Sequence, residues 1–144
     1  KLPVAHRVGE KDVQALKNHY AVEKDIDVVV FSAPQLSIYE LRDLATMCEG
    51  KQFKKPLLAI TSPQVKPDCD RFGYTQRIEE AGGTVLSGMC FYQSYAREMS
   101  ETKGWKRLAT NSAKLVNILG GYGYVPMLAS MNECVEAAQT GALQ

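Results

Sequence analysis

One stretch decides how this sequence is interpreted: Arg107-Leu108-Ala109-Thr110-Asn111-Ser112-Ala113-Lys114-Leu115-Val116. A short apolar run gives way to small and polar residues, and a helical pattern then begins with a lysine in its first turn. If the run is a strand of an open α/β sheet, Asn111 and Ser112 lie at its C-terminal end, where such sheets bind ligands. Helix N-termini also favour anions, so these side chains and Lys114 could hold a carboxylate or a phosphate. The alternative is structural: Asn111 or Ser112 caps the helix, and Lys114 is solvated.

Short apolar runs alternate with helical patterns along the whole chain. The β-branched run Val28-Val29-Val30-Phe31 is typical of a parallel strand buried on both faces. We expect strands at 26–31, 56–61, 84–87, 107–110 and 125–128, and helices at 10–20, 37–49, 65–81, 92–99, 113–119 and 131–139. This alternation predicts a single α/β domain over residues 1–144, folded as a three-layer α/β/α sandwich with a mainly parallel sheet of four to five strands.

Composition excludes several classes of protein. The formal net charge is only +1, and no basic block occurs, so we expect no electrostatic binding to nucleic acid or to a membrane surface. No apolar run approaches the roughly 18 residues of a membrane span. The N-terminus, Lys1-Leu2-Pro3-Val4, does not resemble a secretory signal, so we expect a cytoplasmic protein with reduced thiols.

Four cysteines are widely spaced and form no Cys-x-x-Cys pair, which excludes a zinc ribbon or a thioredoxin-type motif. Cys48 and Cys134 fall on the apolar faces of expected helices and should be core residues. Cys69 lies in a polar stretch and is expected at or near the surface. Cys90 lies where a strand passes into a loop, and it is the cysteine best placed for chemistry.

Polar side chains follow each expected strand, beginning with Ser32 and Gln35 after the first. The others are Thr61, Ser62, Ser87, Cys90, Asn111, Ser112 and Lys114. Because the C-terminal ends of parallel strands meet at one edge of a sheet, Cys90, Ser62 and Ser112 could lie together there. The alternative is that loops after strands are polar in general and supply helix caps.

Several motifs occur in the same order as in the C-terminal part of the aconitase X catalytic subunit, which this chain resembles from about residue 9 onward. The motifs are Val-Val-Val-Phe-Ser-Ala-Pro-Gln-Leu-Ser (28–37), Gly-Thr-Val leading to Cys90 (83–90), Ala-Thr-Asn-Ser-Ala-Lys (109–114) and Ser-Met-Asn-Glu-Cys-Val-Glu-Ala-Ala-Gln-Thr-Gly (130–141). That family includes cis-3-hydroxy-L-proline dehydratases and the large subunit of archaeal mevalonate-5-phosphate dehydratase.

The resemblance implies a hydro-lyase that dehydrates a small anionic hydroxy acid with an iron–sulfur cluster. It implies that Cys90 is a cluster ligand and that Ser112 abstracts the proton, although serine needs strong stabilisation to act as a base. Asn111 and Lys114 would hold the anionic group of the substrate, with Ser62 as a further substrate-binding residue. The implied partners are the remaining part of the catalytic subunit and a small swivelling domain or subunit.

Two departures from the family pattern leave a second interpretation open. Many members have Cys-Pro-His where this chain has Ala33-Pro34-Gln35, and an aromatic residue with Ala-Pro-Gly where it has 117–121. With one matching cysteine, the chain alone should not hold a stable cluster, because clusters ordinarily need three or four ligands. The alternative is a stand-alone, metal-free α/β binding or interaction module that has lost the chemistry. A flavodoxin-like or receiver-like domain would need a flavin loop or an acidic cluster, and the sequence has neither.

Overall fold

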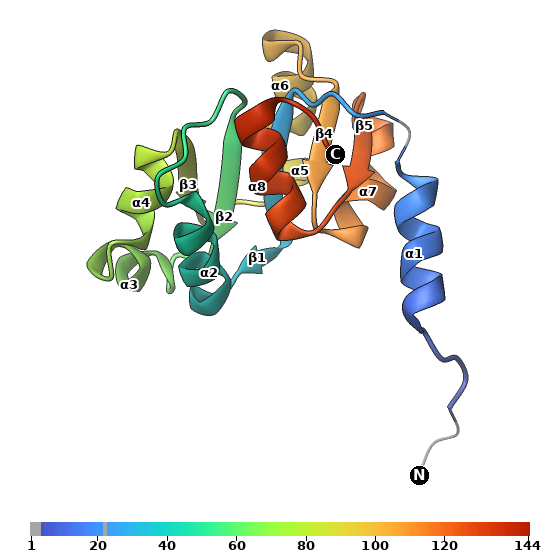
Figure 1. Ribbon diagram of the computed structural model, residues 1–144, viewed down its shortest axis with the longest axis horizontal. Coiled ribbons are helices and arrows are strands. Elements are labelled where there is room, and N and C mark those ends of the chain that lie inside the picture. Colours follow the sequence, from blue (N-terminus) through green and yellow to red (C-terminus); the bar gives the residue numbers. More distant parts are fainter. Residues whose placement is uncertain (1–3, 22) are drawn as a thin grey trace.

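A five-stranded sheet lies between two layers of helices in the computed structural model, which describes residues 4–21 and 23–144 (Figure 1). Every pairing in the sheet is parallel. Its strands are β1 (Val28–Leu36), β2 (Leu57–Thr61), β3 (Gly83–Ser87), β4 (Arg107–Thr110) and β5 (Val125–Leu128). The expected α/β/α sandwich and its five strands are confirmed.

The strand order is β3-β2-β1-β4-β5, so the direction of winding reverses between β1 and β4. These two central strands pair only briefly, through Val28 with Leu108 and Val29 with Ala109. β1 then continues for several residues beyond this pairing, toward its C-terminal end. Open α/β sheets bind ligands in the crevice at such a reversal.

Helices cover both faces of the sheet. One face packs against α2 (Ile38–Cys48), α3 (Lys66–Arg71), α4 (Tyr74–Glu80) and α8 (Met131–Thr140). The other packs against α5 (Phe91–Ser94), α6 (Ala96–Lys103) and α7 (Ala113–Leu119), which runs into the 3₁₀ turn η1 (Gly120–Tyr122). α1 (Glu10–His19) stands beside β5, apart from both layers (Figure 1).

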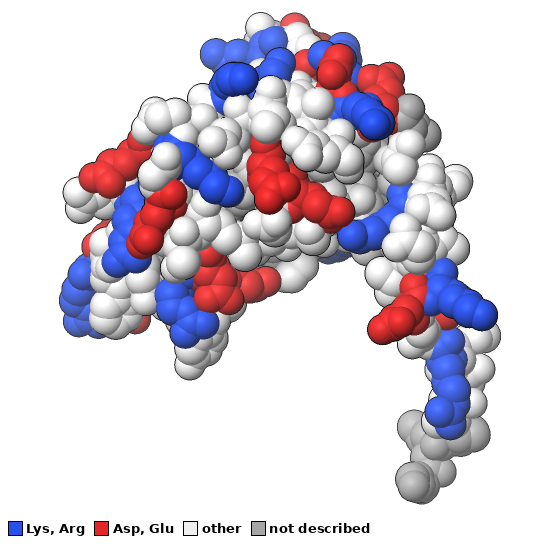
Figure 2. Space-filling model, in the orientation of Figure 1, with Lys and Arg blue, Asp and Glu red and all other residues white. Residues whose placement is uncertain are grey.

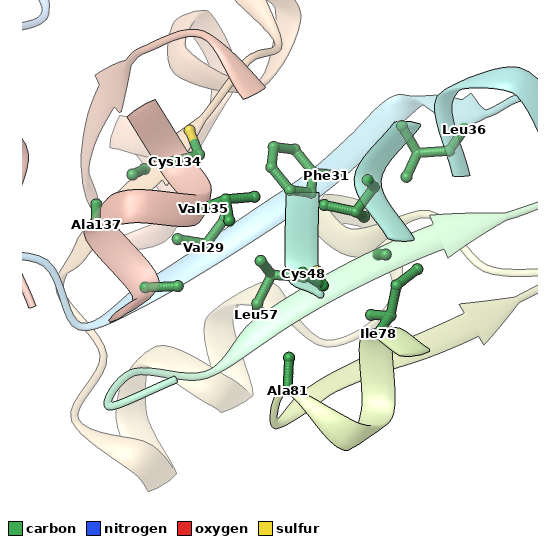
Figure 3. Packing of buried hydrophobic residues seen from close by; sticks show 14 of the residues in the cluster. Val29, Phe31, Leu36, Cys48, Leu57, Ile78, Ala81, Cys134, Val135 and Ala137 are labelled. Carbon is green, nitrogen blue, oxygen red and sulfur yellow. The ribbon is translucent and has the colours of Figure 1, made fainter. Parts of the chain in front are cut away.

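The apolar core is divided by the sheet. Because side chains alternate along a strand, Val29 and Phe31 of β1 contribute to the cluster under α2, α4 and α8, which Figure 3 shows from close by. Val28 and Val30 contribute to the opposite cluster, with Phe91 of α5 and other apolar residues. The long β1 strand therefore holds both halves of the core together, as its β-branched sequence predicts.

Three cysteines belong to the core, not to a functional site. Cys48 and Cys134 are buried as expected, but Cys69 is also completely buried, so its expected place at the surface is wrong. The polar residues around Cys69 in sequence occupy the outer side of α3, while its sulfur accepts a hydrogen bond from the Thr75 hydroxyl at 3.3 Å. Burial raises the pKa of Cys48 to about 11 and also raises those of Cys69 and Cys134.

The largest differences from the expected boundaries are three, besides shifts of a few residues at other ends. The helix expected at 65–81 is divided by Gly73, whose φ of 73° is left-handed. The helix expected at 92–99 is divided at Tyr95, where φ is −140°. β1 extends to Leu36, beyond the expected end at residue 31, because Leu36 pairs with Thr61 after an irregularity in the register.

An ion pair ties β1 to β4 at the N-terminal edge of the sheet. The Arg107 Nη2 donates to Asp27 Oδ1 at 2.8 Å, and the backbone N–H groups of Lys106 and Arg107 donate to Oδ2 at 3.0 and 2.8 Å. The Arg107 side chain, helped by these N–H groups, holds the pKa of Asp27 well below its usual value despite partial burial. The two central strands are therefore firmly joined at the edge opposite the crevice.

Candidate functional site

The Ser112 hydroxyl bridges the two walls of the crevice between β1 and β4. Its Oγ donates to the Ala33 carbonyl at 2.6 Å and accepts from the Leu115 N–H at 3.2 Å, which makes Ser112 the N-cap of α7. The side chain is buried. The carbonyl that it reaches belongs to an alanine with a φ of 53°, a left-handed conformation uncommon for residues other than glycine. The expected capping role and the expected site position are thus combined in one residue.

This geometry sets a condition on any role of Ser112 as a base. Its proton points at the Ala33 carbonyl, and an alkoxide 2.6 Å from a carbonyl oxygen would be repelled by it. To accept a proton from a substrate, the hydroxyl must first leave Ala33. As it stands, Ser112 can donate to the Ala33 carbonyl of β1 and fix the start of α7.

The segment that carries Cys90 extends toward β1 although β3, the strand before it, is at the edge of the sheet. Three strand spacings separate β3 from β4, or about 14 Å. The connection after β3 crosses most of this distance, because the Gln35 Nε2 donates to the Met89 carbonyl at 3.0 Å and ties the loop to the end of β1, the neighbour of β4. Cys90 follows directly as the N-cap of α5 and is partly exposed.

Lys114 comes to the same region from the first turn of α7. Its Nζ lies 5.4 Å from the centroid of the Tyr92 ring, a cation–π contact that joins α7 to α5. Asn111 is exposed at the end of β4, next to Ser112. The structure therefore brings the Asn111–Lys114 loop and the Cys90 segment to the same side of the sheet.

Ser62 has a different environment from the other expected site residues. Its Oγ accepts from the Val65 N–H at 3.2 Å and so closes the turn before α3. The same segment contacts the loop after β3, where the Gly88 N–H donates to the Thr61 carbonyl at 3.2 Å. Ser62 lies at the expected edge of the sheet, but its hydroxyl supports its own turn.

Ser32 lies at the centre of this edge and has an unusual hydroxyl. The residue is 2% exposed, and its Oγ has no hydrogen-bond partner among the described residues. Strand alternation places its side chain on the same face as Val30, the face covered by α5 and α7. Buried polar groups are nearly always hydrogen-bonded, so this hydroxyl is an exception among the described residues.

The sequence does not identify two supporting residues. It gives Tyr92 only as the start of an expected helix, and Gln35 only as a polar residue after β1 and a departure from a family pattern. Their partners, Lys114 and the Met89 carbonyl, are 22 and 54 residues away in sequence. The one available signal was that each lies within three residues of a position singled out for chemistry, namely Cys90 or Ser32.

The chain does not by itself fit a metal cluster. Within residues 4–21 and 23–144, no group of three or more His, Cys, Asp and Glu side chains is placed to hold a metal ion. Of the four free cysteines, all in the described part, Cys90 alone is not buried. An iron–sulfur cluster needs three or four ligands, and these residues offer one at most.

No described helix has the length and apolarity needed to span a membrane.

An open parallel sheet with polar side chains at its winding reversal defines a class, that of α/β domains built to bind ligands at the C-terminal edge of the sheet. A comparison with protein-family models identifies one family within this class. A family model described as the aconitase X third domain matches residues 26–140, and the chain belongs to that family.

Known relatives agree with this assignment. The large subunit of phosphomevalonate dehydratase from Thermococcus kodakarensis is 30% identical over 135 residues, which cover 91% of this chain and 33% of that protein. The cis-3-hydroxy-L-proline dehydratase of Pseudomonas aeruginosa is 30% identical over 84% of this chain and 21% of its own length. A crystal structure of Thermococcus kodakaraensis aconitase X in its holo-form superposes with a TM-score of 0.76 at 25% identity, over 94% of this chain and 36% of that one. The chain thus spans about a third of the Thermococcus proteins.

Proposed function

We propose that this chain is the C-terminal portion of the catalytic subunit of an aconitase X-type hydro-lyase, which dehydrates a small anionic hydroxy acid. One observation supports the proposal: the residues on either side of Cys90 contact the neighbourhood of Ser112, since the Met89 carbonyl accepts from Gln35 of β1 and the Tyr92 ring contacts Lys114 of α7. Sheet order alone would have left Cys90 about three strands away. The printed activities of the relatives, both dehydratases, agree with it.

Each residue has a role suited to its surroundings. The exposed Asn111 amide and the Lys114 ammonium would bind the anionic group of the substrate, since both donate hydrogen bonds and lysine adds a charge. Ser112 would carry the proton, once its hydroxyl has turned from Ala33 toward the substrate. Ser62 would contribute at the neighbouring strand end, where it also closes its own turn.

We further propose that Cys90 is the single ligand that this chain gives to an iron–sulfur cluster. A cluster of this kind supplies Lewis acidity toward a substrate hydroxyl. The other ligands would come from the remaining part of the catalytic subunit and from a small swivelling domain or subunit. Free thiols at all four cysteines suit a reducing compartment, so we place the enzyme in the cytoplasm.

Anaerobic reconstitution with iron and sulfide tests the cluster proposal, with visible absorption and iron content as readouts. The 144-residue chain should bind no stable cluster, whereas the full-length subunit with its partner should. Cys90→Ala should remove iron from the complete enzyme, and the matched variant Cys48→Ala, which alters a core thiol, should not. Full iron content in the Cys90→Ala enzyme would overturn the assignment.

A second function, a metal-free binding module, is favoured by the lone accessible thiol in the described residues. The two functions predict different results for the complete gene product. A module should bind phosphate or a carboxylate through Lys114, lose that binding in Lys114→Ala, and contain no iron. A dehydratase should contain iron and release water from phosphomevalonate or cis-3-hydroxy-L-proline.

A further inference from the structure

Lys114 carries a positive charge at a place where a helix disfavours one. It lies in the first turn of α7, and the unpaired N–H groups at this end give the helix a partial positive charge. The first turn of α7 contains no acidic residue. The Lys114 side chain is exposed, and none of the ion pairs among residues 4–21 and 23–144 includes it. No carboxylate in the described part of the chain therefore neutralises this ammonium.

Several other basic residues in this protein are paired with carboxylates. An example is Lys66, whose Nζ lies 2.6 Å from Asp70 Oδ1. On the face shown in Figure 2, basic and acidic groups lie next to one another over much of the surface. Lys114 lies instead against the Tyr92 ring, 5.4 Å from its centroid. The quadrupole of an aromatic ring attracts a cation without bringing an opposite charge, so Tyr92 holds the ammonium and leaves its charge available to an anion.

The Tyr92 ring has supports of its own. It meets the Tyr122 ring edge-on, with the centroids 6.3 Å apart and the ring planes at 72°. The Arg97 guanidinium lies 5.7 Å from the centroid of the Tyr122 ring. Next to Tyr92 in sequence, Phe91 is buried and packs against Tyr124, with the centroids 5.9 Å apart. The Tyr92 ring is therefore fixed both by its own short helix and by a second tyrosine.

The contact between Tyr92 and Lys114 joins the first turns of two helices. Tyr92 is the second residue of α5, whose N-cap is Cys90. Lys114 is the second residue of α7, whose N-cap is Ser112. The ring therefore draws the ammonium toward the first turn of α5. An exposed lysine otherwise samples many rotamers, and a side chain that is already held in one place loses less entropy when a ligand binds.

We propose that Tyr92 is a positioning residue for anion binding at Lys114: its ring fixes the ammonium at the first turn of α5 without neutralising it, and Tyr122 supports the ring. This inference rests on the proposed function, because it takes Lys114 as the group that binds the anionic part of the substrate. A carboxylate in place of Tyr92 would also hold the ammonium, but it would compete with that anion. An ammonium has three N–H groups, so an anion can bind on the side away from the ring.

The contact itself is tested by NMR on the complete gene product, after reductive dimethylation of its lysines with isotope-labelled formaldehyde, which keeps their charge. The methyl signal of Lys114, assigned by its loss in Lys114→Arg, should show an upfield ring-current shift. The shift should persist in Tyr92→Phe, which keeps a ring, and disappear in Tyr92→Leu. Tyr39→Leu is the matched control, because Tyr39 is exposed and makes its cation–π contact with Arg42 of α2, on the other face of the sheet.

The role in binding is tested by the affinity of the unmethylated protein for inorganic phosphate, measured by calorimetry. Tyr92→Leu should raise the dissociation constant about 2- to 5-fold, the factor expected from the loss of an exposed cation–π contact. It should raise KM for the substrate by a similar factor and leave kcat unchanged, because the ring acts on binding through Lys114. Tyr92→Phe and Tyr39→Leu should keep the native values. Tyr122→Leu removes the support but keeps the ring and the ammonium, so it should give a smaller rise, and it provides the test if Tyr92→Leu does not fold.

Three results would overturn the proposal. The first is a Lys114 signal without a ring-current shift in the native protein. The second is unchanged or tighter binding of phosphate in Tyr92→Leu, since the ring would then be a structural contact only or would hold the ammonium away from the ligand. The third is a native protein that binds no phosphate, since Lys114 would then serve no anion. A gene product without iron or turnover would contradict the proposed hydro-lyase and would leave the shift and the phosphate affinities as they are.

Discussion

Replacement of Ser112 by alanine is the most informative single change, because this residue has both a structural and a proposed chemical role. The variant removes the N-cap of α7 and the hydrogen bond to the Ala33 carbonyl. It leaves the apolar core on either side of the sheet intact. We therefore expect a loss of stability in the 144-residue chain, independent of any substrate.

The two lost hydrogen bonds set the size of the effect. An N-cap replaced by alanine costs about 1 kcal/mol. A buried carbonyl left without its donor costs about 1–3 kcal/mol. Together we expect a loss of about 2–4 kcal/mol in the free energy of unfolding, which lowers the melting temperature of a chain of this size by roughly 5–15 °C.

Urea denaturation at constant m-value, with calorimetry in parallel, measures the loss. Ser112→Thr is the matched control, because threonine keeps a hydroxyl that can cap the helix and donate to Ala33. It should fall between the native chain and Ser112→Ala. A loss below about 0.5 kcal/mol in Ser112→Ala, which is close to the noise of such measurements, would refute the two-bond geometry. The hydroxyl would then be free for chemistry without the rearrangement that we require.

Three further predictions concern other features of the chain. Ser32→Ala removes a buried hydroxyl that has no partner among the described residues, so we expect about 1 kcal/mol of added stability by calorimetry; a lower melting temperature would reveal a partner. Iodoacetamide should modify Cys90 first, because the other thiols are buried, and peptide mass spectrometry that finds equal labelling at Cys69 would contradict the structure. The Ser130 hydroxyl, then its N–H, and the Lys17 ammonium lower the pKa of Glu133 from its usual 4.5 to about 2. A lowered pKa stabilises the fold above the unfolded value, so the difference in urea midpoint between the native chain and Glu133→Gln should be full near neutral pH and should disappear between about pH 4.5 and 2; a constant difference would refute the interaction.

The sheet was predictable because its signal is local. Each buried strand is a short apolar run, and the capping boxes at Ser37 and Ser130 fix the start of α2 and α8. The interruptions were harder to predict. Gly73 takes a left-handed conformation that divides a helix, and glycine is tolerated within helices often enough that the sequence did not decide the matter.

The site was predictable in outline and not in its contacts. A polar loop after a parallel strand identifies the edge, and Ser112 lies there. The tie between Gln35 and the Met89 carbonyl depends on the path of a connection across two strands, which no local pattern encodes. Cys69 was expected at the surface because its neighbours in sequence are polar, but its thiol is buried in the core.

The unequal fastening of β1 to β4 gives the crevice a preferred direction of movement. At the N-terminal end, the Arg107 guanidinium and two backbone N–H groups donate hydrogen bonds to the Asp27 carboxylate. At the C-terminal end, the Ser112 hydroxyl donates one hydrogen bond to the Ala33 carbonyl. Widening at the serine end requires the loss of one hydrogen bond, whereas parting at the arginine end would break a charged network. A bound molecule that replaces the Ala33 carbonyl as the serine's partner could therefore enter without unfolding the sheet. We therefore expect the strands to stay together at the Asp27–Arg107 pair when such a molecule binds.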